Sequence, residues 1–239
     1  LFIFTLFILC GCVSTPETGR TAFLITSEAQ EAQLGSQAFS ETLRKERLST
    51  NASWNAILQR VGQRISRAAN KPDYQWEFRL IESKEPNAFC LPGGKVAFYT
   101  GIIPFLQNEA AMAAVMGHEV AHATARHGGQ RMTAAFGTQI GFLALGELLG
   151  AQSKNSDLLM AALGMGAQVG VLLPFSRSHE SEADEIGLIY MARAGYDPAE
   201  APRFWDRFAK AGGNAPPEFL STHPASSNRK QALEAQLPK

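Results

Sequence analysis

Residues 117–127 read GHEVAHATARH, and this stretch constrains the fold more than any other part of the chain. His118 and His122 are four positions apart, so an α-helix places both imidazoles on one face, one above the other. Glu119 lies about 100° around the helix from His118, close enough to reach a water held between the histidines. This is the H-E-x-x-H arrangement, in which zinc lowers the pKa of its water and the glutamate takes the proton. The fold must therefore bring a third protein ligand to this helix.

His127 is the nearest candidate for the third ligand. In the metzincin pattern the third histidine follows the second by six residues, with a glycine midway that breaks the helix. Here the spacing from His122 is one residue shorter, and Ala125 stands where that glycine would be. On a continuous helix His127 would lie about 180° from His118 and would face away from the ion. We therefore predict that His127 has a structural role.

A glutamate from a later helix offers another third ligand. Residues 176–188, SRSHESEADEIGL, contain Glu180 and Asp184 at i and i+4, so both can face one ion. We predict that Glu180 ligates one Zn²⁺ per chain together with the two histidines, which leaves one position for water. Asp184 would accept a hydrogen bond from the far nitrogen of a ligand histidine. Glu182, about 200° around the helix from Glu180, would point elsewhere; without the upstream histidines, this pattern would indicate only an acidic, solvated helix face.

The ordered motifs of the chain resemble those of the gluzincin-type zinc metallopeptidases related to HtpX, the CaaX prenyl protease and the periplasmic protease BepA. The resemblance rests on four segments in the expected order, NAFCLPGGKVAFYTG (87–101), GHEVAHATARH (117–127), ESEAD (180–184) and STHPASSNR (221–229). It implies that the first glutamate of E-x-x-A-D, Glu180, is the third zinc ligand. It also implies a metalloendopeptidase that acts on polypeptides.

Two further roles come from the resemblance. Asn87, Ala88 and Phe89 resemble the edge strand of the family, to which an extended substrate would add through main-chain hydrogen bonds. A purely structural hairpin is the alternative for these residues. His223 resembles a family histidine near the metal, which would stabilise the oxyanion or occupy the water position in a resting state. As a lone loop histidine before Pro224, it is equally typical of a structural turn.

The periodicity of apolar residues predicts an α+β fold that is mostly helical. We expect a compact gluzincin-type domain with a small antiparallel sheet beside the H-E-x-x-H helix. The strands are expected at 74–83 and 95–101, joined through a turn. The helices are expected at 27–47, 52–69, from 107 with a break at Gly128 and Gly129, 177–194, 198–212 and from about 226. Two Ala/Gly-rich stretches, 133–150 and 158–173, are expected to form a helical hairpin that is buried or partly faces a membrane.

The first residues, LFIFTLFILCGC, are typical of the apolar part of a secretory signal. We predict a signal peptide, truncated at its start, at 1–11, a lipidated tether at 12–25 and the zinc metallopeptidase domain at 26–239. Leu9 to Cys12 resemble a bacterial lipobox, so Cys12 is the candidate for lipidation; the alternative is a signal peptide that merely contains cysteines. Val13, which is not Asp, points in this resemblance to the inner leaflet of the outer membrane, facing the periplasm.

The balance of charges excludes a class of partner. Lys and Arg number 22, as do Asp and Glu, so no net charge attracts the chain to nucleic acid. We expect a lipid-anchored zinc metalloendopeptidase that cleaves misfolded or unassembled envelope proteins. Two alternatives stay open: a chaperone-like assembly factor for outer-membrane proteins with little or gated proteolysis, and a structural lipoprotein without metal.

Overall fold

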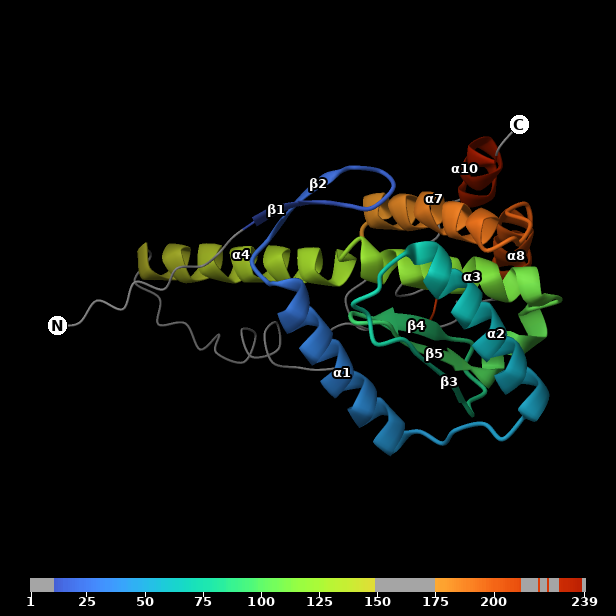
Figure 1. Ribbon diagram of the computed structural model, residues 1–239. Coiled ribbons are helices and arrows are strands. Elements are labelled where there is room, and N and C mark those ends of the chain that lie inside the picture. The colour runs from blue at the N-terminus through green and yellow to red at the C-terminus, as the bar shows by residue number, and fades with distance from the viewer. Residues whose placement is uncertain (1–10, 149–174, 212–218, 220–222, 224–227, 238–239) are drawn as a thin grey trace.

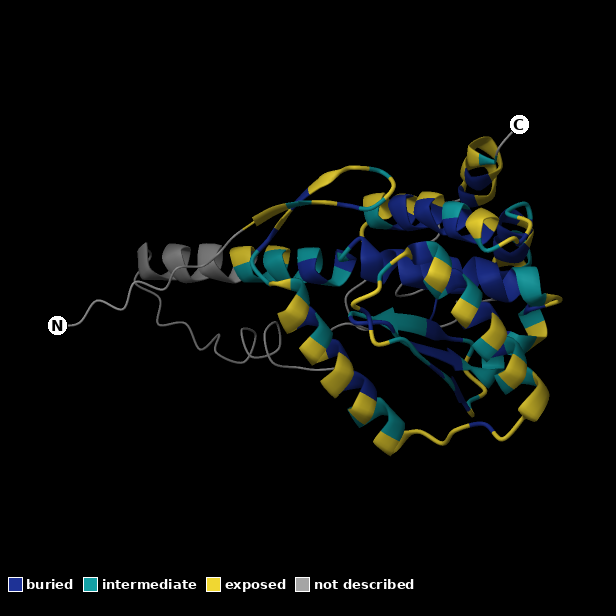
Figure 2. Ribbon diagram, viewed as in Figure 1, coloured by how far each residue is buried: buried dark blue, intermediate teal, exposed yellow. Residues whose placement is uncertain are grey.

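A helix that is buried along nearly its whole length, α3 (Glu109–Thr124), runs through the middle of the structure (Figure 1). The computed structural model describes residues 11–148, 175–211, 219, 223 and 228–237. Every residue of α3 from Ala111 to Thr124 is buried (Figure 2). Because such a helix must be covered on all its faces, several elements pack around it. These are α2 (Ala52–Ala69), α7 (Arg177–Arg193), α8 (Glu200–Ala211) and strand β4 (Ala88–Leu91).

The remaining elements complete an α+β fold that is mostly helical, and this confirms the predicted fold class. They are β1 (Gly11–Ser14), β2 (Thr21–Leu24), α1 (Glu28–Lys45), β3 (Glu77–Ile81), β5 (Lys95–Tyr99), the 3₁₀ helix η1 (Thr100–Phe105), α4 (His127–Leu148) and α10 (Arg229–Gln236). Helix α2 has the bounds that its periodicity predicts. The Asn51 side chain accepts from the Trp54 amide at its start, and Asn70 ends it in the left-handed conformation.

The larger sheet differs from the expected antiparallel pair. Its strand order is β3-β5-β4, with β3 parallel to β5 and β4 antiparallel to β5. The prediction of a turn between 74–83 and 95–101 was wrong because β4 itself lies within that connection and makes a tight hairpin with β5. Gly93 and Gly94, both at positive φ, form the turn of that hairpin. Two reversals of direction between β3 and β5 leave these strands parallel.

The histidine helix breaks earlier than predicted. The expected break at Gly128 and Gly129 was wrong, because both glycines lie within α4. The chain instead turns at Arg126, whose φ is 56°. Two contacts stabilise this left-handed residue: its guanidinium lies 2.7 Å from a carboxylate oxygen of Glu31 and donates to the Thr26 carbonyl at 2.7 Å. The Glu31 side chain of α1 and the main chain just before α1 thereby fix the direction in which α4 leaves α3.

Most of the segment expected as a tether forms the antiparallel β1–β2 hairpin. Cys12 pairs with Phe23, and both side chains are exposed. Ala22 and Leu24 alternate with Phe23 and are buried, so this hairpin lies against the protein on one face. The Ile25 amide also donates to Thr133 Oγ1 of α4 at 3.2 Å. The chain that follows residue 11 is therefore packed against the domain.

Two sequence predictions fall wholly or partly outside the described residues. The expected signal peptide, 1–11, has only its last residue within them, and the second half of the expected helical hairpin, 158–173, lies outside them. The first half, 133–150, belongs to α4 as far as Leu148. Within the described ranges, no helix combines the length and the apolar content needed to cross a bilayer.

Helices α3 and α7 cross in direct backbone contact. A Cβ built on Gly117 would lie 2.9 Å from the Gly187 carbonyl oxygen, and one built on Gly187 would lie 3.0 Å from the His118 amide nitrogen. No side chain fits at either position without moving backbone. This close approach brings the side chains of α7 within reach of His118.

Substitution of Gly117 by Ala is expected to separate α3 from α7 and to lower the free energy of unfolding by about 1–3 kcal/mol, as overpacking does. Gly128→Ala is the matched control, because a Cβ there meets nothing within 4 Å and alanine favours a helix by about 1 kcal/mol over glycine. Chemical denaturation measures both. Equal effects of the two substitutions would contradict the close crossing.

Candidate metal centre

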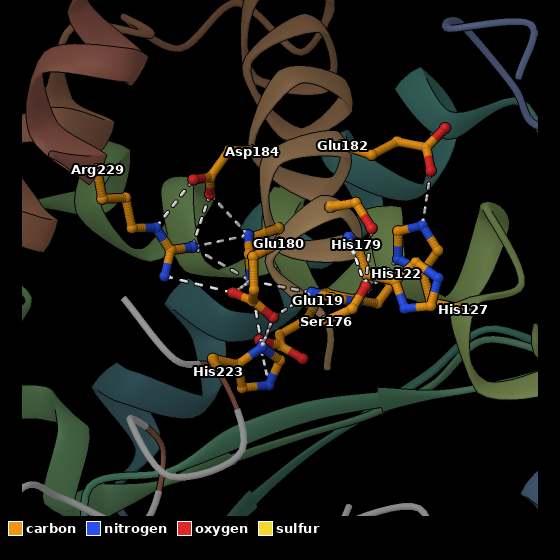
Figure 3. A network of polar contacts seen from close by, with 12 residues as sticks. Glu119, His122, His127, Ser176, His179, Glu180, Glu182, Asp184, His223 and Arg229 are labelled. Carbon is orange, nitrogen blue, oxygen red and sulfur yellow. Dashed lines mark hydrogen bonds and ion pairs between the residues drawn. The ribbon is translucent and has the colours of Figure 1, made fainter. Parts of the chain in front are cut away.

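Four buried side chains bring their ligand atoms together between α3 and α7. His118 and His122 come from α3, Glu180 from the first turn of α7, and His223 from the segment before α10. One ligand atom from each lies within 4.8 Å of all the others. Figure 3 shows Glu180 and His223 directed at each other below α7. The structure thus assembles the three predicted ligands with His223 as a fourth potential ligand.

The nitrogen and oxygen atoms of this group crowd one point. His118 Nε2 lies 3.1 Å from His122 Nε2 and 3.3 Å from His223 Nδ1. Glu180 Oε1 lies 3.0 Å from His223 Nδ1 and 3.3 Å from His122 Nε2. Imidazole lone pairs that converge in this way repel one another unless a proton or a cation lies between them.

The chemistry of these atoms fits a zinc ion. Imidazole nitrogen and carboxylate oxygen are common zinc donors, and three or four of them make up a catalytic site. Glu180 Oε2 is buried and makes no hydrogen bond within the described residues, although His118 Nε2 and Arg229 Nη1 lie 3.3 Å and 3.4 Å from it. Burial raises the pKa of Glu180, but His118 and His122 outweigh this effect and hold it far below its ordinary value. The site therefore offers an ionised carboxylate that lacks part of its hydrogen bonding.

The far nitrogen of His118 contacts the predicted acceptor. His118 Nδ1 lies 2.9 Å from Asp184 Oδ1, one turn along α7 from Glu180. Burial and the charge of Arg229 lower the pKa of His118, but Glu180 and Asp184 outweigh them and raise it to about 9. The protein thus stabilises a positive charge at His118, as expected of a site built around a cation.

Arg229 is a site residue that the sequence analysis missed. Its guanidinium donates to both oxygens of Asp184, at 2.9 Å and 2.6 Å (Figure 3). It also stacks on the Trp205 ring, 3.5 Å from the ring centre. Trp205 in turn packs edge-on against His118. Arg229 ends the segment STHPASSNR, but its charge alone gave no signal, because most arginines lie at the surface.

His127 lies next to the metal group without belonging to it. Its absence from the group of converging ligand atoms agrees with the predicted structural role, but the helix is not continuous as that prediction assumed, because the chain turns at Arg126. His127 Nδ1 lies 3.0 Å from His122 Nδ1, the nitrogen of His122 opposite the convergence point. Its other nitrogen lies 2.9 Å from Glu182 Oε2 (Figure 3). Glu182 points away from Glu180, as expected, and toward His127.

Glu119 lies beside the convergence point. Its carboxylate is buried, and Oε1 is 3.5 Å from His223 Nε2 without a hydrogen bond to any described residue. Burial raises the pKa of Glu119 above its usual range. A carboxylate in this state is suited to take up a proton, which is the property required of a general base.

An aromatic side chain covers the histidines from another direction. The ring centre of Phe175 lies 3.9 Å from that of His122 and 5.2 Å from that of His223. The guanidinium of Arg131 also stacks on the Phe175 ring, 3.6 Å from the ring centre. Neither residue carried a recognisable signal in the sequence, because each reaches the site only through tertiary packing.

The predicted substrate strand forms an edge of the sheet. Among the described strands, β4 pairs with β5 alone and is the strand in closest contact with α3. Ala88 is buried, and Phe89 packs against Phe39 and Tyr99, so these side chains face the protein. The Ala88 amide already donates to Asn87 Oδ1 at 2.8 Å. An added strand would therefore contact the remaining main-chain groups rather than these side chains.

The chain is similar to known metallopeptidases over a segment that includes the metal group. The model of peptidase family M48 matches residues 52–237. The mitochondrial metalloendopeptidase OMA1 of Schizosaccharomyces pombe is 39% identical over 184 residues, which cover 76% of this chain and 52% of the relative. The protein of that name from Saccharomyces cerevisiae is 33% identical, over 94% of this chain and 68% of its own length. The beta-barrel assembly-enhancing protease of Escherichia coli is 31% identical, over 90% of this chain and 45% of its own length.

Loss of the Glu180 carboxylate is expected to remove zinc, because two histidines from one helix leave the ion without a third protein ligand. Glu180→Ala should leave substoichiometric zinc in protein purified without chelator, measured by atomic emission. Glu185→Ala removes an exposed carboxylate from the same helix and should retain one zinc per chain. Zinc loss in both variants, or in neither, would contradict the position of the site.

Proposed function

The chain belongs to peptidase family M48, a family of zinc metallopeptidases, and from this premise we propose that it is a zinc metalloendopeptidase. The observation that carries the proposal is the buried group of His118, His122, Glu180 and His223 with Glu119 beside it. The chain spans 52% of the first relative compared above. The activity, substrates and partners given below for this chain are therefore proposals.

The proposed ligands divide by element and by role. His118 and His122 bind zinc through Nε2, because their Nδ1 atoms face Asp184 and His127. Glu180 is the third ligand, and Asp184 orients His118 by accepting from its far nitrogen. When bound, zinc supplies a Lewis acid at the point where these atoms meet.

Glu119 is the proposed general base. Its buried carboxylate takes a proton from the attacking water and then passes it to the leaving amine of the cleaved peptide. The raised pKa of Glu119 favours this transfer, because the protonated intermediate form of the carboxyl group is less costly than it would be in water. No other carboxylate in the described metal group is free to do so, since Glu180 is a ligand.

His223 is proposed to occupy the fourth position in a resting state and to stabilise the oxyanion once substrate displaces it. It contacts both Glu180 and Glu119, at 3.0 Å and 3.5 Å. Phe219 stacks on its ring with 4.6 Å between centres. A histidine that reaches the ligand group in this way competes with water for the ion.

Extended polypeptides are the proposed substrates. The edge strand at Ala88–Leu91 lies against the helix that carries Glu119, so a peptide added to this edge passes the metal group. The strand contributes main-chain contacts, because Ala88 and Phe89 face the core. Such recognition selects an extended conformation more than a sequence, which suits misfolded or unassembled proteins as substrates.

We propose that the protein is held at a membrane facing the periplasm by lipidation of Cys12. Two observations support this location: Cys12 is exposed, and it pairs in the hairpin with Phe23, an apolar residue that is 53% exposed. Envelope proteins would then be its substrates, as part of protein quality control. The name of the Escherichia coli relative, a beta-barrel assembly-enhancing protease, agrees with this setting.

A second function is favoured by one contact. His223 lies within the ligand group and can fill the position that water would take, as expected of an assembly factor with little or gated proteolysis. The two functions differ in whether Glu119 is needed.

Replacement of Glu119 by Gln is expected to reduce cleavage of a labelled unfolded protein by about 100-fold or more, because the amide cannot accept the proton. Zinc content should stay at one per chain, since Glu119 is not a ligand. Glu185→Gln makes the same chemical change at an exposed position and should cleave as the wild type does. Wild-type protein that binds clients but cleaves none, with no change in Glu119→Gln, would favour the assembly factor.

Lipidation of Cys12 predicts where the protein fractionates. When the natural precursor is expressed in a Gram-negative host, Cys12→Ala should move the protein from the membrane fraction to the soluble periplasmic fraction. Cys90→Ala removes the other described thiol, which lies in β4, and should leave the protein in the membrane fraction. Membrane association of Cys12→Ala equal to that of the wild type would contradict a lipid anchor at this residue.

A further inference from the structure

The orientation of His122 depends on a second histidine. His122 Nε2 faces the metal group, 3.3 Å from Glu180 Oε1, while its Nδ1 lies 3.0 Å from His127 Nδ1. One of these two Nδ1 atoms must donate a proton and the other must accept it. Which atom donates decides whether His122 presents a lone pair or a proton to the metal.

Glu182 decides the direction of this hydrogen bond. Its carboxylate only accepts, so His127 donates from Nε2 to Glu182 Oε2 across 2.9 Å. A neutral imidazole carries a single N–H, so a His127 ring that donates from Nε2 accepts at Nδ1, the atom 3.0 Å from His122 Nδ1. His122 therefore donates from Nδ1, and its Nε2 keeps the lone pair that a metal requires.

The N-terminal hairpin holds Glu182 in place. Thr15 Oγ1 donates to Glu182 Oε1 at 2.8 Å, and Thr18 Oγ1 donates to the same atom. Arg20 donates to Oε2 from Nε at 2.8 Å and from Nη2 at 2.6 Å. All three donors lie in the loop between β1 and β2 or at its end. A segment 162 residues earlier in the chain thus fixes the Glu182 carboxylate.

These contacts are shielded from water along most of their length. His127 is fully buried, and Thr15 and Glu182 are 4% and 7% exposed. His179 stacks on His127 with 4.4 Å between ring centres, which keeps the ring in its plane. Arg20, with 40% of its side chain exposed, is the most exposed member, and Thr18 and His179 are half-buried. Hydrogen bonds in such a setting hold geometry more strongly than exposed ones.

His118, the other histidine ligand on α3, is oriented in a similar way but without an intervening residue. His118 Nδ1 contacts Asp184 directly, and Arg229 holds that carboxylate with two hydrogen bonds. In each case a carboxylate of α7, held by an arginine, fixes a histidine of α3. Between His122 and its carboxylate, Glu182, the His127 ring lies as an intermediate that contacts both.

We propose that His127 and Glu182 are positioning residues for His122, and that the hairpin at residues 11–24 is thereby a structural part of the metal centre. The inference rests on the proposed zinc site and adds to it a dependence on the segment next to the proposed anchor. A hairpin that leaves its place on the domain frees Glu182, and the preference of His122 for the metal-binding tautomer is lost with it.

His127 acts in this proposal through His122 and not as a ligand. Both of its ring nitrogens are engaged, one by His122 and the other by Glu182. It is also absent from the group of converging ligand atoms. Loss of its Nδ1 should therefore weaken zinc binding without abolishing it, unlike loss of Glu180.

Zinc affinity of the full chain, measured by competition with a chromophoric chelator, tests the proposal. His127→Phe keeps an aromatic ring but removes the acceptor, and we expect affinity to fall by about 10–100-fold, as for other residues that orient a ligand. His127→Asn should restore part of the loss, because its side-chain oxygen can accept from His122. The absorption spectrum of the cobalt-loaded protein should also change in His127→Phe, since it reports the geometry of the ligands.

Arg20→Ala tests the hairpin itself without altering the core. It should lower zinc affinity by roughly 3–10-fold, because the two threonines still donate to Glu182. Arg193→Ala is the matched control. It breaks the ion pair with Glu17, which joins the same loop to α7 and is separate from the contacts described above for Glu182. This control should leave zinc affinity and the cobalt spectrum unchanged.

The outcomes separate this proposal from the proposed function. Wild-type zinc affinity and cobalt spectra in both His127→Phe and Arg20→Ala would overturn the positioning role while leaving the zinc peptidase intact. Failure of the wild type and of the Arg193→Ala control to bind zinc at all would overturn the metal site itself. If His127→Phe does not fold, Arg20→Ala with its control still decides, because that side chain lies at the surface.

Discussion

The contact of two glycines, Gly117 on α3 and Gly187 on α7, sets the geometry on which the site depends. It lets the helix backbones approach until a Cβ on either residue would overlap the other helix. At that separation the first turn of α7 reaches the face of α3 that carries His118 and His122. Larger residues at the crossing would hold the carboxylate of Glu180 away from the histidines, whatever the local sequence of each helix.

The same crossing buries several charges, and the surrounding contacts offset the cost. Three carboxylates of α7 enter the interior, each next to a group of opposite or variable charge. Glu180 faces the histidines, Asp184 is bound by Arg229, and Glu182 is bound by Arg20 and His127. Removing one partner of such a set leaves a buried charge without compensation, which is costly. The polar network therefore stabilises one relative position of α3, α7 and the N-terminal hairpin.

The spacing of residues along each helix was enough to predict the main residues of the site. Contacts between residues distant in sequence could not be predicted from it. His118, His122, Glu180 and Asp184 lie on two helices at spacings of four, so their shared faces follow from helix geometry alone. The position of His127 did not follow, since it depends on one left-handed residue, Arg126, which is held by Glu31 far along the chain.

The sheet shows the same limit. Alternation located β3 and β5, but only the hairpin between β4 and β5 makes β3 and β5 parallel. Arg229 ends the segment STHPASSNR, but its charge alone did not assign it to the site, and Phe175 lies in none of the four segments that carry the resemblance. The arrangement of ligand atoms as a whole is tested most directly by anomalous X-ray diffraction at the zinc absorption edge from crystals of the full chain. We predict a single peak per chain bound by His118 Nε2, His122 Nε2 and Glu180; zinc bound to His127, or no peak at this point, would contradict the account.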